Sequence, residues 1–296
     1  MPVKIGTRGS RLALAQAEKV CALLLDRGIE AEEVIISTKG DTETSVPLHE
    51  IGGQGVFVRA LDDAILAGEI DAAVHSMKDI PAKRPFGLVT SAILKRDSPA
   101  DFIAHTIPLD SVSVIGTSST RRKAQLLRHD PSLDIRQLRG NVDTRLRKLN
   151  EGVFDAIILA EAGMQRMNLS ISGERLPPDV FVPAPNQGTI AVVSRDDPAL
   201  SEIFSLLDHG QTRQDVMAER AVMEEVGGGC FTPQGIYCSG GHLIAEVLSL
   251  DGTRRVRVED DIKTPDDARR CGMKLHNEAK ELIDDAYRAL GIEDER

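Results

Sequence analysis

The sequence predicts an α/β protein with a C-terminal segment built on a different pattern. Up to about residue 210, short and continuous apolar runs alternate with amphipathic helical stretches, which is typical of strands covered by helices on both faces. Beyond that point a helix, a glycine-rich loop, a hairpin and a long final helix follow, which indicates a smaller α+β segment. The 296 residues are enough for two or three domains with separate cores.

Eight short apolar runs in the α/β part are predicted to be strands, because most of them are continuous rather than alternating. They are residues 3–6, 34–37, 72–75, 88–93, 112–116, 135–138, 156–160 and 190–194. The last run is predicted to return to the sheet of the first domain, which makes that domain discontinuous.

The C-terminal segment begins with a predicted helix at 215–226, which leads into the glycine loop. The apolar runs 243–250 and 254–258 flank Asp251-Gly252, a dipeptide that favours a hairpin turn. This part is therefore expected to pair antiparallel strands.

The final helix has signals at both ends. Thr264 can cap it, Pro265 fits its first turn and Asp267 stands three residues after Thr264, while Gly291 follows its end. Apolar residues at steps of three and four predict one buried face: Ala268, Cys271, Leu275, Ala279, Leu282, Ala286 and Leu290.

The net charge of −10 argues against a nucleic-acid-binding protein, since a phosphate backbone needs a dense cationic face. One region departs from this balance: residues 116–148 hold nine basic residues and three acids. An acidic protein has thus kept one cationic region. No apolar run approaches the length of a membrane span, and the first residues lack the pattern of a signal peptide, so a soluble cytoplasmic protein is expected.

The four cysteines do not form a disulfide framework or a metal-ligand spacing, so free thiols are expected. Cys21 and Cys271 lie on apolar helical faces, and Cys238 lies in a strand candidate. Cys230 instead ends the loop Gly227-Gly228-Gly229-Cys230, where three glycines leave room around its sulfur. The alternative is a loop cysteine without a role.

Three strand-to-helix junctions, at 5–10, 116–122 and 139–145, combine hydroxyl or amide side chains with arginines. In an α/β sheet, ligands bind beyond the carboxyl ends of the strands, where helix N-termini present free N–H groups. Because arginine binds a carboxylate in a bidentate manner, these junctions predict a site for an anion with several acidic groups. The alternative is that Ser10, Ser119 and Asn141 act only as helix caps.

Asp79 ends another strand candidate, in the segment 74–81. A carboxylate beside cationic junctions is unexpected in a site for acids unless it faces a developing positive charge. The alternative is an ion pair with Lys78 or with a nearby arginine.

These motifs together resemble those of the porphobilinogen deaminase family, also called hydroxymethylbilane synthase. The resemblance covers nearly the whole chain in one order and rests on residues 5–10, 74–79, 116–122, 138–142, 155–160 and 228–230. It implies two hinged α/β domains like those of type II periplasmic binding proteins, plus a smaller C-terminal α+β domain that carries the cofactor cysteine. The expected ranges are 1–95 with 189–208 for the first domain, 99–186 for the second and 212–296 for the third.

The resemblance also implies a dipyrromethane cofactor, joined to Cys230 by a thioether, on which four porphobilinogen molecules are condensed with loss of ammonia and released as hydroxymethylbilane. It implies a catalytic role for Asp79 and no metal. The cofactor-binding residues by position are Cys230, Lys78, Asp79, Ser119, Arg121, Arg122 and Arg139. The substrate-binding residues are Arg8, Ser10, Gln16, Arg139, Arg145, Arg166 and Gln187. A monomer that passes its product to uroporphyrinogen-III synthase is expected.

Five positions depart from the family pattern, namely Gln54, Arg59, Glu161, Asn186 and Thr189. Two other functions fit parts of the sequence. A non-enzymatic anion-binding protein would use the junction arginines but would leave Asp79 and Cys230 without a role. A cysteine hydrolase would need His75 or His242 as its base, and no spacing singles out either.

Overall fold

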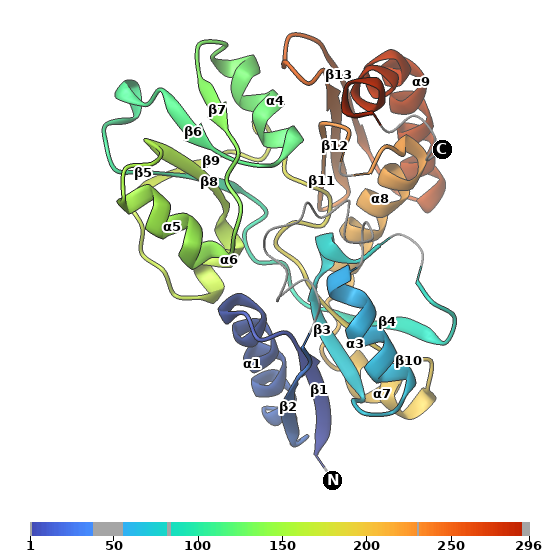
Figure 1. The fold of residues 1–296 in the computed structure, drawn as a ribbon. Coiled ribbons are helices and arrows are strands. Elements are labelled where there is room, and N and C mark those ends of the chain that lie inside the picture. The colour runs from blue at the N-terminus through green and yellow to red at the C-terminus, as the bar shows by residue number, and fades with distance from the viewer. Residues whose placement is uncertain (1, 38–55, 82–83, 230, 292–296) are drawn as a thin grey trace. The chain divides into compact units, whose positions relative to one another are not determined.

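The computed structural model describes residues 2–37, 56–81, 84–229 and 231–291 (Figure 1). The chain divides into two compact units. Unit 1 comprises Met1–Asp97, Gln165–Leu169 and Gly188–Arg213, and unit 2 comprises Ser98–Met164, Ser170–Gln187 and Gln214–Arg296. Each unit is described by itself.

Unit 1 is built on a five-stranded sheet with the order β2-β1-β3-β10-β4. The strands are β1 (Val3–Thr7), β2 (Ala31–Ile35), β3 (Ala72–Ser76), β4 (Leu88–Ile93) and β10 (Ile190–Arg195). β1 runs parallel to β2 and β3, whereas β10 lies antiparallel between β3 and β4. Helices α1 (Arg11–Leu25), α3 (Val56–Leu66) and α7 (Pro198–Ser205) accompany it. The core includes the fully buried Ile5, Leu24 and Phe204.

Unit 2 contains a second five-stranded sheet with the order β7-β6-β8-β5-β9. Its strands are β5 (Asp101–His105), β6 (Val114–Gly116), β7 (Asp134–Arg136), β8 (Ala156–Ala160) and β9 (Gly173–Leu176). The helices are α4 (Thr120–His129), α5 (Val142–Asn150) and α6 (Glu161–Arg166), the last two residues of which belong to unit 1. β5 is antiparallel to both β8 and β9, while β6 is parallel to β7 and β8.

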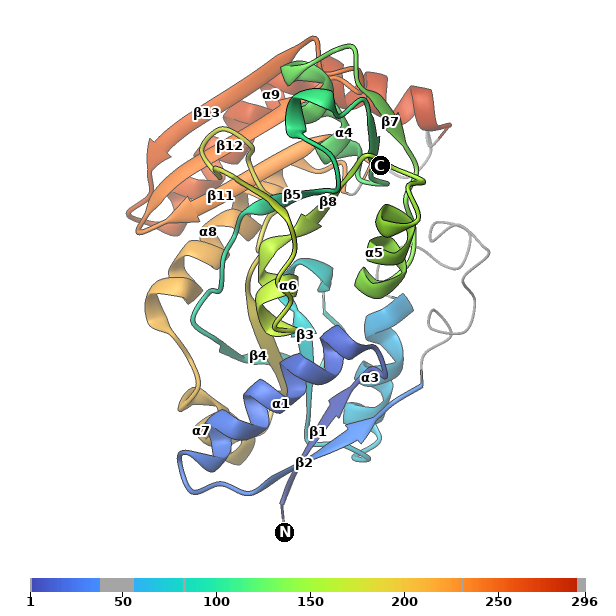
Figure 2. The same cartoon turned by 90° about the vertical axis from the view of Figure 1, so that its left-hand side faces the viewer.

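The rest of unit 2 is an antiparallel sheet of β11 (Gln234–Ser239), β12 (His242–Leu248) and β13 (Arg255–Asp261). Helix α9 (Pro265–Leu290) packs against β12 and β13 (Figure 2), and α8 (Gly210–Val226) leads into the glycine loop. The predicted capping box of Thr264 and Asp267 is present, and Gly291 ends α9 in the left-handed conformation with φ of 69°. Cys271 lies in the core of this part, as predicted, and so does Cys238, which lies in β11 as expected of its strand candidate.

The β12–β13 hairpin packs on α4 through Gly252, which has φ of 74°. A Cβ at this position would collide with the carbonyl oxygen of Ala124 and lie 2.7 Å from the backbone nitrogen of Arg128. The turn therefore needs glycine both for its conformation and for its close approach to the helix.

The predicted fold class is confirmed: the structure has two mixed α/β sheets with helices and a C-terminal α+β part. The strand predicted at 34–37 is observed at 31–35, and β5 and β9 were not predicted. Within the described residues, none of the helices has both the length and the apolar character needed to cross a membrane. The same residues contain no cluster of His, Cys, Asp and Glu that would hold a metal ion.

Candidate functional site

Asp79 and Lys78 lie in unit 1, in the short 3₁₀ helix η1 (Met77–Asp79) directly after β3, and both are exposed. Arg8 follows β1 and is half-buried. Because β1 and β3 are parallel neighbours, their carboxyl ends meet at the same edge of the sheet. The sheet thus brings the predicted residues of two junctions to one edge.

Helix α1 contributes two of the predicted residues. Ser10 is its N-cap, and the side chain accepts a hydrogen bond from the backbone nitrogen of Ala13 at 3.3 Å. Gln16 is buried, and its Nε2 donates to Oγ of Ser76 at 2.9 Å. These contacts fix α1 to the end of β3. Substrate contacts of Ser10 and Gln16 stay predictions.

Arg166 is nearly buried in unit 1. Its Nε lies 2.8 Å from Oδ2 of Asp97, and its Nη2 donates to the carbonyl of Gly188 at 2.7 Å. Burial lowers the pKa of Arg166, whereas the carboxylates of Asp97 and Asp79 act in the opposite direction. Asp79 therefore lies close enough to this guanidinium to stabilise its charge.

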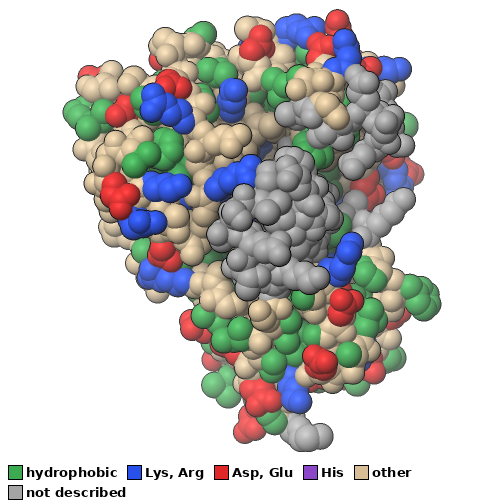
Figure 3. Space-filling model, viewed as in Figure 1, with side chains coloured by type: hydrophobic (Ala, Val, Ile, Leu, Met, Phe, Trp, Pro, Cys, Tyr) green, Lys and Arg blue, Asp and Glu red, His purple; other side chains and the backbone are tan. Residues whose placement is uncertain are grey.

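Unit 2 holds the other cationic junctions. Ser119 caps α4 by accepting from the backbone nitrogen of Arg122 at 3.4 Å, and Asn141 caps α5 in the same way at 2.9 Å from the nitrogen of Thr144. The three predicted junction side chains, Ser10, Ser119 and Asn141, are thus all helix caps. Basic side chains gather over α5 and its surroundings (Figure 3).

Arg145 is a partly buried cation of this region. Its Nε donates to the carbonyl of Gly140 at 2.8 Å. Burial, together with the nearby charge of Arg122, lowers its pKa to about 10. Arg139 stands exposed between β7 and α5. Burial and neighbouring positive charge therefore disfavour the charged form of Arg145. Such a concentration of positive charge is expected of a site for anions.

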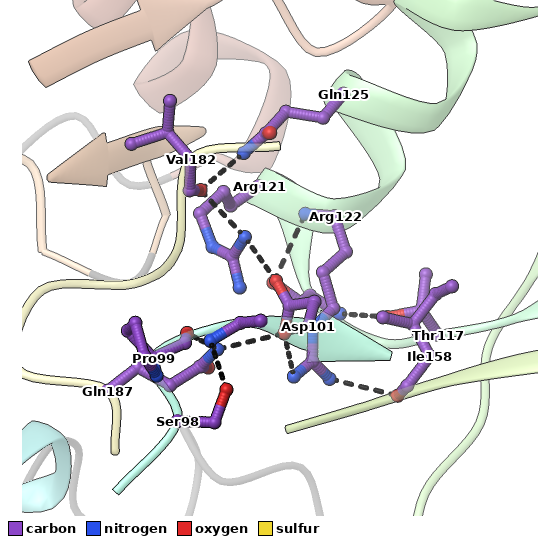
Figure 4. Close-up of polar contacts among 12 residues, drawn as sticks. Ser98, Pro99, Asp101, Thr117, Arg121, Arg122, Gln125, Ile158, Val182 and Gln187 are labelled. Atoms are coloured by element: carbon purple, nitrogen blue, oxygen red, sulfur yellow. Dashed lines mark hydrogen bonds and ion pairs between the residues drawn. The ribbon is translucent and has the colours of Figure 1, made fainter. Parts of the chain in front are cut away.

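Arg121 and Arg122 both bind Asp101, the first residue of β5, which is completely buried (Figure 4). Arg121 Nη1 lies 2.7 Å from Oδ2, and Arg122 donates to Oδ1 from Nη2 at 2.7 Å and from Nε at 3.1 Å. Burial acts to raise the pKa of Asp101, but the two arginines outweigh it and hold that pKa well below its usual range. Asp101 thus lies between two buried positive charges, and Glu246 also favours the charged state of Arg121.

The same guanidinium groups also bind the backbone. Arg121 Nη1 donates to the carbonyl of Val182 at 2.9 Å, and Arg122 Nη1 donates to that of Ile158 at 3.0 Å. The two arginines therefore join α4 to β5, to β8 and to the segment after β9. Direct contact of either residue with a cofactor stays a prediction.

Sequence reasoning missed Asp101, although one signal was present. Residues 116–148 carry an excess of positive charge, and Asp101 is a lone acid at the start of an apolar run. Gln187, predicted to bind substrate, is also part of this cluster: its Nε2 donates to Oδ1 of Asp101 at 3.0 Å and to the carbonyl of Pro99 at 2.8 Å. Its side chain is buried.

Cys230 and Gln54 lie outside the described residues. The loop before Cys230 is described: Gly227, Gly228 and Gly229 all have positive φ, and a Cβ on Gly228 would collide with Thr232. Gln234 Nε2 donates to the carbonyls of Gly227 and Gly229 at 3.2 and 3.0 Å. The glycines are thus required by the backbone conformation, not only by access to the thiol.

The other three thiols are poor nucleophiles. Burial raises the pKa of Cys21 to about 11, and burial together with Asp215 raises that of Cys238 further. Cys271 is buried, and its pKa is raised as well, first by burial. Because the thiolate is the reactive form, none of them suits covalent attachment.

Neither histidine considered as a base stands out for that role. Burial, Arg84 and Arg8 lower the pKa of His75 to about 3, so its imidazole is neutral and enclosed. His242 is exposed at the start of β12, and its Nδ1 lies 3.0 Å from Asp261. No described contact links either residue to a thiol.

Two of the departures from the family pattern have structural roles in unit 2. Glu161 accepts a hydrogen bond from Ser98 and lies 3.2 Å from Nε of Arg175. The backbone nitrogen of Asn186 donates to Oε2 of Glu219 at 2.5 Å.

Comparison with known proteins identifies the family. The family model for the dipyrromethane cofactor-binding domain of porphobilinogen deaminase matches residues 3–202, and the model for its C-terminal domain matches residues 213–281. A probable porphobilinogen deaminase of Methanosarcina barkeri is 49% identical over 302 residues, covering 97% of this chain and 96% of that protein. The porphobilinogen deaminase of Nitratidesulfovibrio vulgaris is 42% identical, covering 95% and 93%.

A third relative, a probable porphobilinogen deaminase of Methanosarcina acetivorans, is 53% identical over 86% of this chain and 84% of its own length. Among solved structures, a periplasmic substrate-binding protein of an ABC transporter from Coxiella burnetii aligns with a TM-score of 0.43 and 16% identity. The alignment covers 72% of this chain and 94% of that protein. This likeness is too weak to carry a conclusion. On the family models and these relatives, the chain belongs to the porphobilinogen deaminase family, the enzymes that use a dipyrromethane cofactor in tetrapyrrole biosynthesis.

Proposed function

We propose that this enzyme joins four porphobilinogen molecules head to tail, with loss of one ammonia at each addition, and hydrolyses the linear product off as hydroxymethylbilane. The growing chain is held on a dipyrromethane attached to Cys230 by a thioether. The observation that carries the proposal is the burial of Arg121 and Arg122 against Asp101, together with Arg145, whose pKa is lowered by burial and by the nearby charge of Arg122. This concentration of positive charge supports a site for a ligand that becomes more negative with each added ring.

The charge of the substrate explains why such a site is needed. Each porphobilinogen ring carries an acetate and a propionate, so every addition brings two more negative charges. Fixed guanidinium groups bind carboxylates with defined geometry and remain charged at neutral pH. The residues that would hold the cofactor are Lys78, Asp79, Ser119, Arg121, Arg122, Arg139 and Cys230. The residues that would bind the incoming substrate are Arg8, Ser10, Gln16, Arg139, Arg145, Arg166 and Gln187.

The donor set of unit 2 fits an acidic pyrrole cofactor, because its arginines outnumber the carboxylate that they bind. When bound, the dipyrromethane supplies the pyrrole carbon to which the first substrate ring is joined. Cys230 suits the attachment because a thiolate is strongly nucleophilic even when it is a minor species at neutral pH.

Asp79 stabilises the positive charge that develops on the substrate as ammonia leaves. An exposed carboxylate directly after β3 can accept hydrogen bonds from pyrrole N–H groups. It lies near the guanidinium of Arg166. The role of Asp79 would thus be to stabilise a positive charge in a site that otherwise binds anions.

We further propose that the protein acts as a cytoplasmic monomer with the three domains expected from the sequence, and that it passes its product to uroporphyrinogen-III synthase. These proposals rest on the family resemblance. Size-exclusion chromatography with light scattering measures the oligomeric state directly.

The decisive test is incubation of the purified protein with porphobilinogen, followed by acidification, oxidation and detection of uroporphyrin I from the cyclised product. The intact mass should exceed the sequence mass by about 420 Da, the size of a thioether-linked dipyrromethane. A protein that gains no such mass, and forms no uroporphyrin I after reconstitution with porphobilinogen, would contradict the proposal.

A further inference from the structure

We propose that Asp62 and Arg84 form a positioning pair that holds the turn carrying Asp79, an inference that rests on the function proposed above. Arg84 Nη2 lies 2.6 Å from Oδ1 of Asp62, and the two side chains are only 12% and 6% exposed. Asp62 belongs to α3, whereas Arg84 follows Asp79 by five residues along the chain. The ion pair therefore ties the segment beyond Asp79 to a helix of unit 1.

The turn buries its apolar residues and exposes its polar ones. Met77 and Ile80 are buried, whereas Lys78 and Asp79 are exposed. η1 is a single 3₁₀ turn closed by a hydrogen bond from the nitrogen of Ile80 to the carbonyl of Met77 at 3.2 Å. A short 3₁₀ turn has poor hydrogen-bond geometry and depends on its surroundings. The position of Asp79 must consequently be set by what holds the chain on either side of it.

The near side is held by two contacts. The nitrogen of Met77 donates to the carbonyl of Thr189 at 2.9 Å, which continues the pairing of β3 with β10. Gln16 binds Ser76, as described above. On the far side, Ile80 is buried, and the pair of Asp62 and Arg84 adds an ion pair further along the chain. Asp79 thus lies between two anchors that both belong to unit 1.

The surroundings of the pair favour this assignment. Two arginines lie close enough to His75 to affect its charge. Burial has the larger effect on the pKa of His75, and Arg84 and Arg8 lower it further. A neutral imidazole adds no third positive charge beside Arg84, which leaves its guanidinium to Asp62. Within the described residues, Nε and Nη1 of Arg84 and Nε2 of His75 are buried without hydrogen-bond partners. Arg84 is therefore held by its contact with Asp62 and not by a wider network of described groups.

The pair acts through geometry, since both side chains are nearly buried. Loss of Arg84 should let Asp79 move relative to its ligand while the other groups of unit 1 stay in place. Because a displacement of about 1 Å can lower a rate by about 100-fold, even a small movement of this turn should be measurable in kcat.

The test compares Arg84→Met, the double variant Asp62→Leu/Arg84→Met and Arg84→Lys, each loaded with cofactor and normalised to it with Ehrlich's reagent. The double variant removes the unpaired buried carboxylate that Arg84→Met leaves, so it should recover thermal stability. Arg84→Met and the double variant should each lose about 10- to 100-fold in kcat, with KM changed less than about 3-fold. Arg84→Lys keeps the charge and should recover part of kcat.

Arg195→Met is the matched control. Arg195 also belongs to unit 1, binds Asp71 at 3.5 Å and donates to the carbonyls of Ile65 and Ile70, but lies at the opposite end of β3 from Asp79. The Arg195→Met variant should have a lower melting temperature than the wild type but the same kcat. Recovery of both stability and kcat in the double variant, or unchanged kcat in Arg84→Met, would overturn the positioning role. A wild-type protein that forms no uroporphyrin I would refute the proposed function itself, and the positioning role with it.

Discussion

Asp101→Asn is expected to destabilise unit 2 strongly, although it keeps the shape of the side chain. The substitution removes the carboxylate that both Arg121 and Arg122 bind, and both arginines are less than a tenth exposed. Removing one partner of a buried ion pair leaves uncompensated charge and typically costs about 3 to 5 kcal/mol. For a unit of this size, that free energy corresponds to a fall in melting temperature of roughly 6 to 20 °C.

Asp134→Asn is the matched control, because it removes a carboxylate that is also 2.6 Å from an arginine, Arg136, but is half exposed. Thermal and urea unfolding of both variants should show a large shift for Asp101→Asn and a small one for Asp134→Asn. Since the arginines hold the pKa of Asp101 low, its stabilising effect is present above the unfolded pKa and is lost as pH falls through the folded value. Equal shifts for the two variants at pH 7 would refute the assignment of Asp101 as the central counter-charge.

Three further predictions concern the reaction and acid stability. Asp79→Asn should keep the cofactor but lower the rate of uroporphyrin I formation by about 10² to 10³, and a wild-type rate would show that the carboxylate has no electrostatic role. Cys230→Ser should lack the added mass of about 420 Da in intact mass spectrometry, and a variant that retains the adduct would exclude the thioether. His75→Gln should lose less stability than the wild type between pH 6 and pH 4, measured by urea unfolding. The reason is that a pKa lowered to about 3 makes the folded state bind fewer protons than the unfolded state, so wild-type stability falls with pH in this range. Identical pH dependence of the two proteins would show that His75 ionises freely.

Local features of the chain were predictable from the sequence. The caps at Ser10, Ser119, Asn141 and Thr264 occur where the sequence places them, because a cap depends on residues three or four positions apart. The continuous apolar runs predicted the buried strands, because this signal also lies within a few consecutive residues. Buried strands such as β3 and β8 differ from the predicted ranges by at most one residue.

Edge strands were less predictable. β2 begins three residues earlier than predicted, because Glu32 and Glu33 are exposed and hide the start of the strand. β9 reads Gly-Glu-Arg-Leu, a polar strand at the border of its sheet, and so gives no apolar signal. β5 is central but begins with a charged residue, which is unusual for a buried position.

The pairing of Asp101 depends on tertiary structure and leaves no periodic signal. Its partners Arg121 and Gln187 lie 20 and 86 positions away along the chain, and only the folded sheet brings them together. The excess of basic residues at 116–148 correctly indicated a cationic region, but not that two of its arginines are buried against an acid. Sequence alone therefore identified the charges without distinguishing those that fix the fold from those left for a ligand.

Helix α4 illustrates why that distinction matters for function. Asp101 holds the two arginines near its N-terminus, while Gly252 of the β12–β13 hairpin packs on its later turns at Ala124 and Arg128. A helix fixed at both positions keeps its positive end and its guanidinium groups in place before any anion arrives. Preorganised charge of this kind stabilises a bound or developing charge without the reorganisation that water would require. The buried acid is thus compatible with an anion site, because it sets the positions of the cations while leaving their net charge positive.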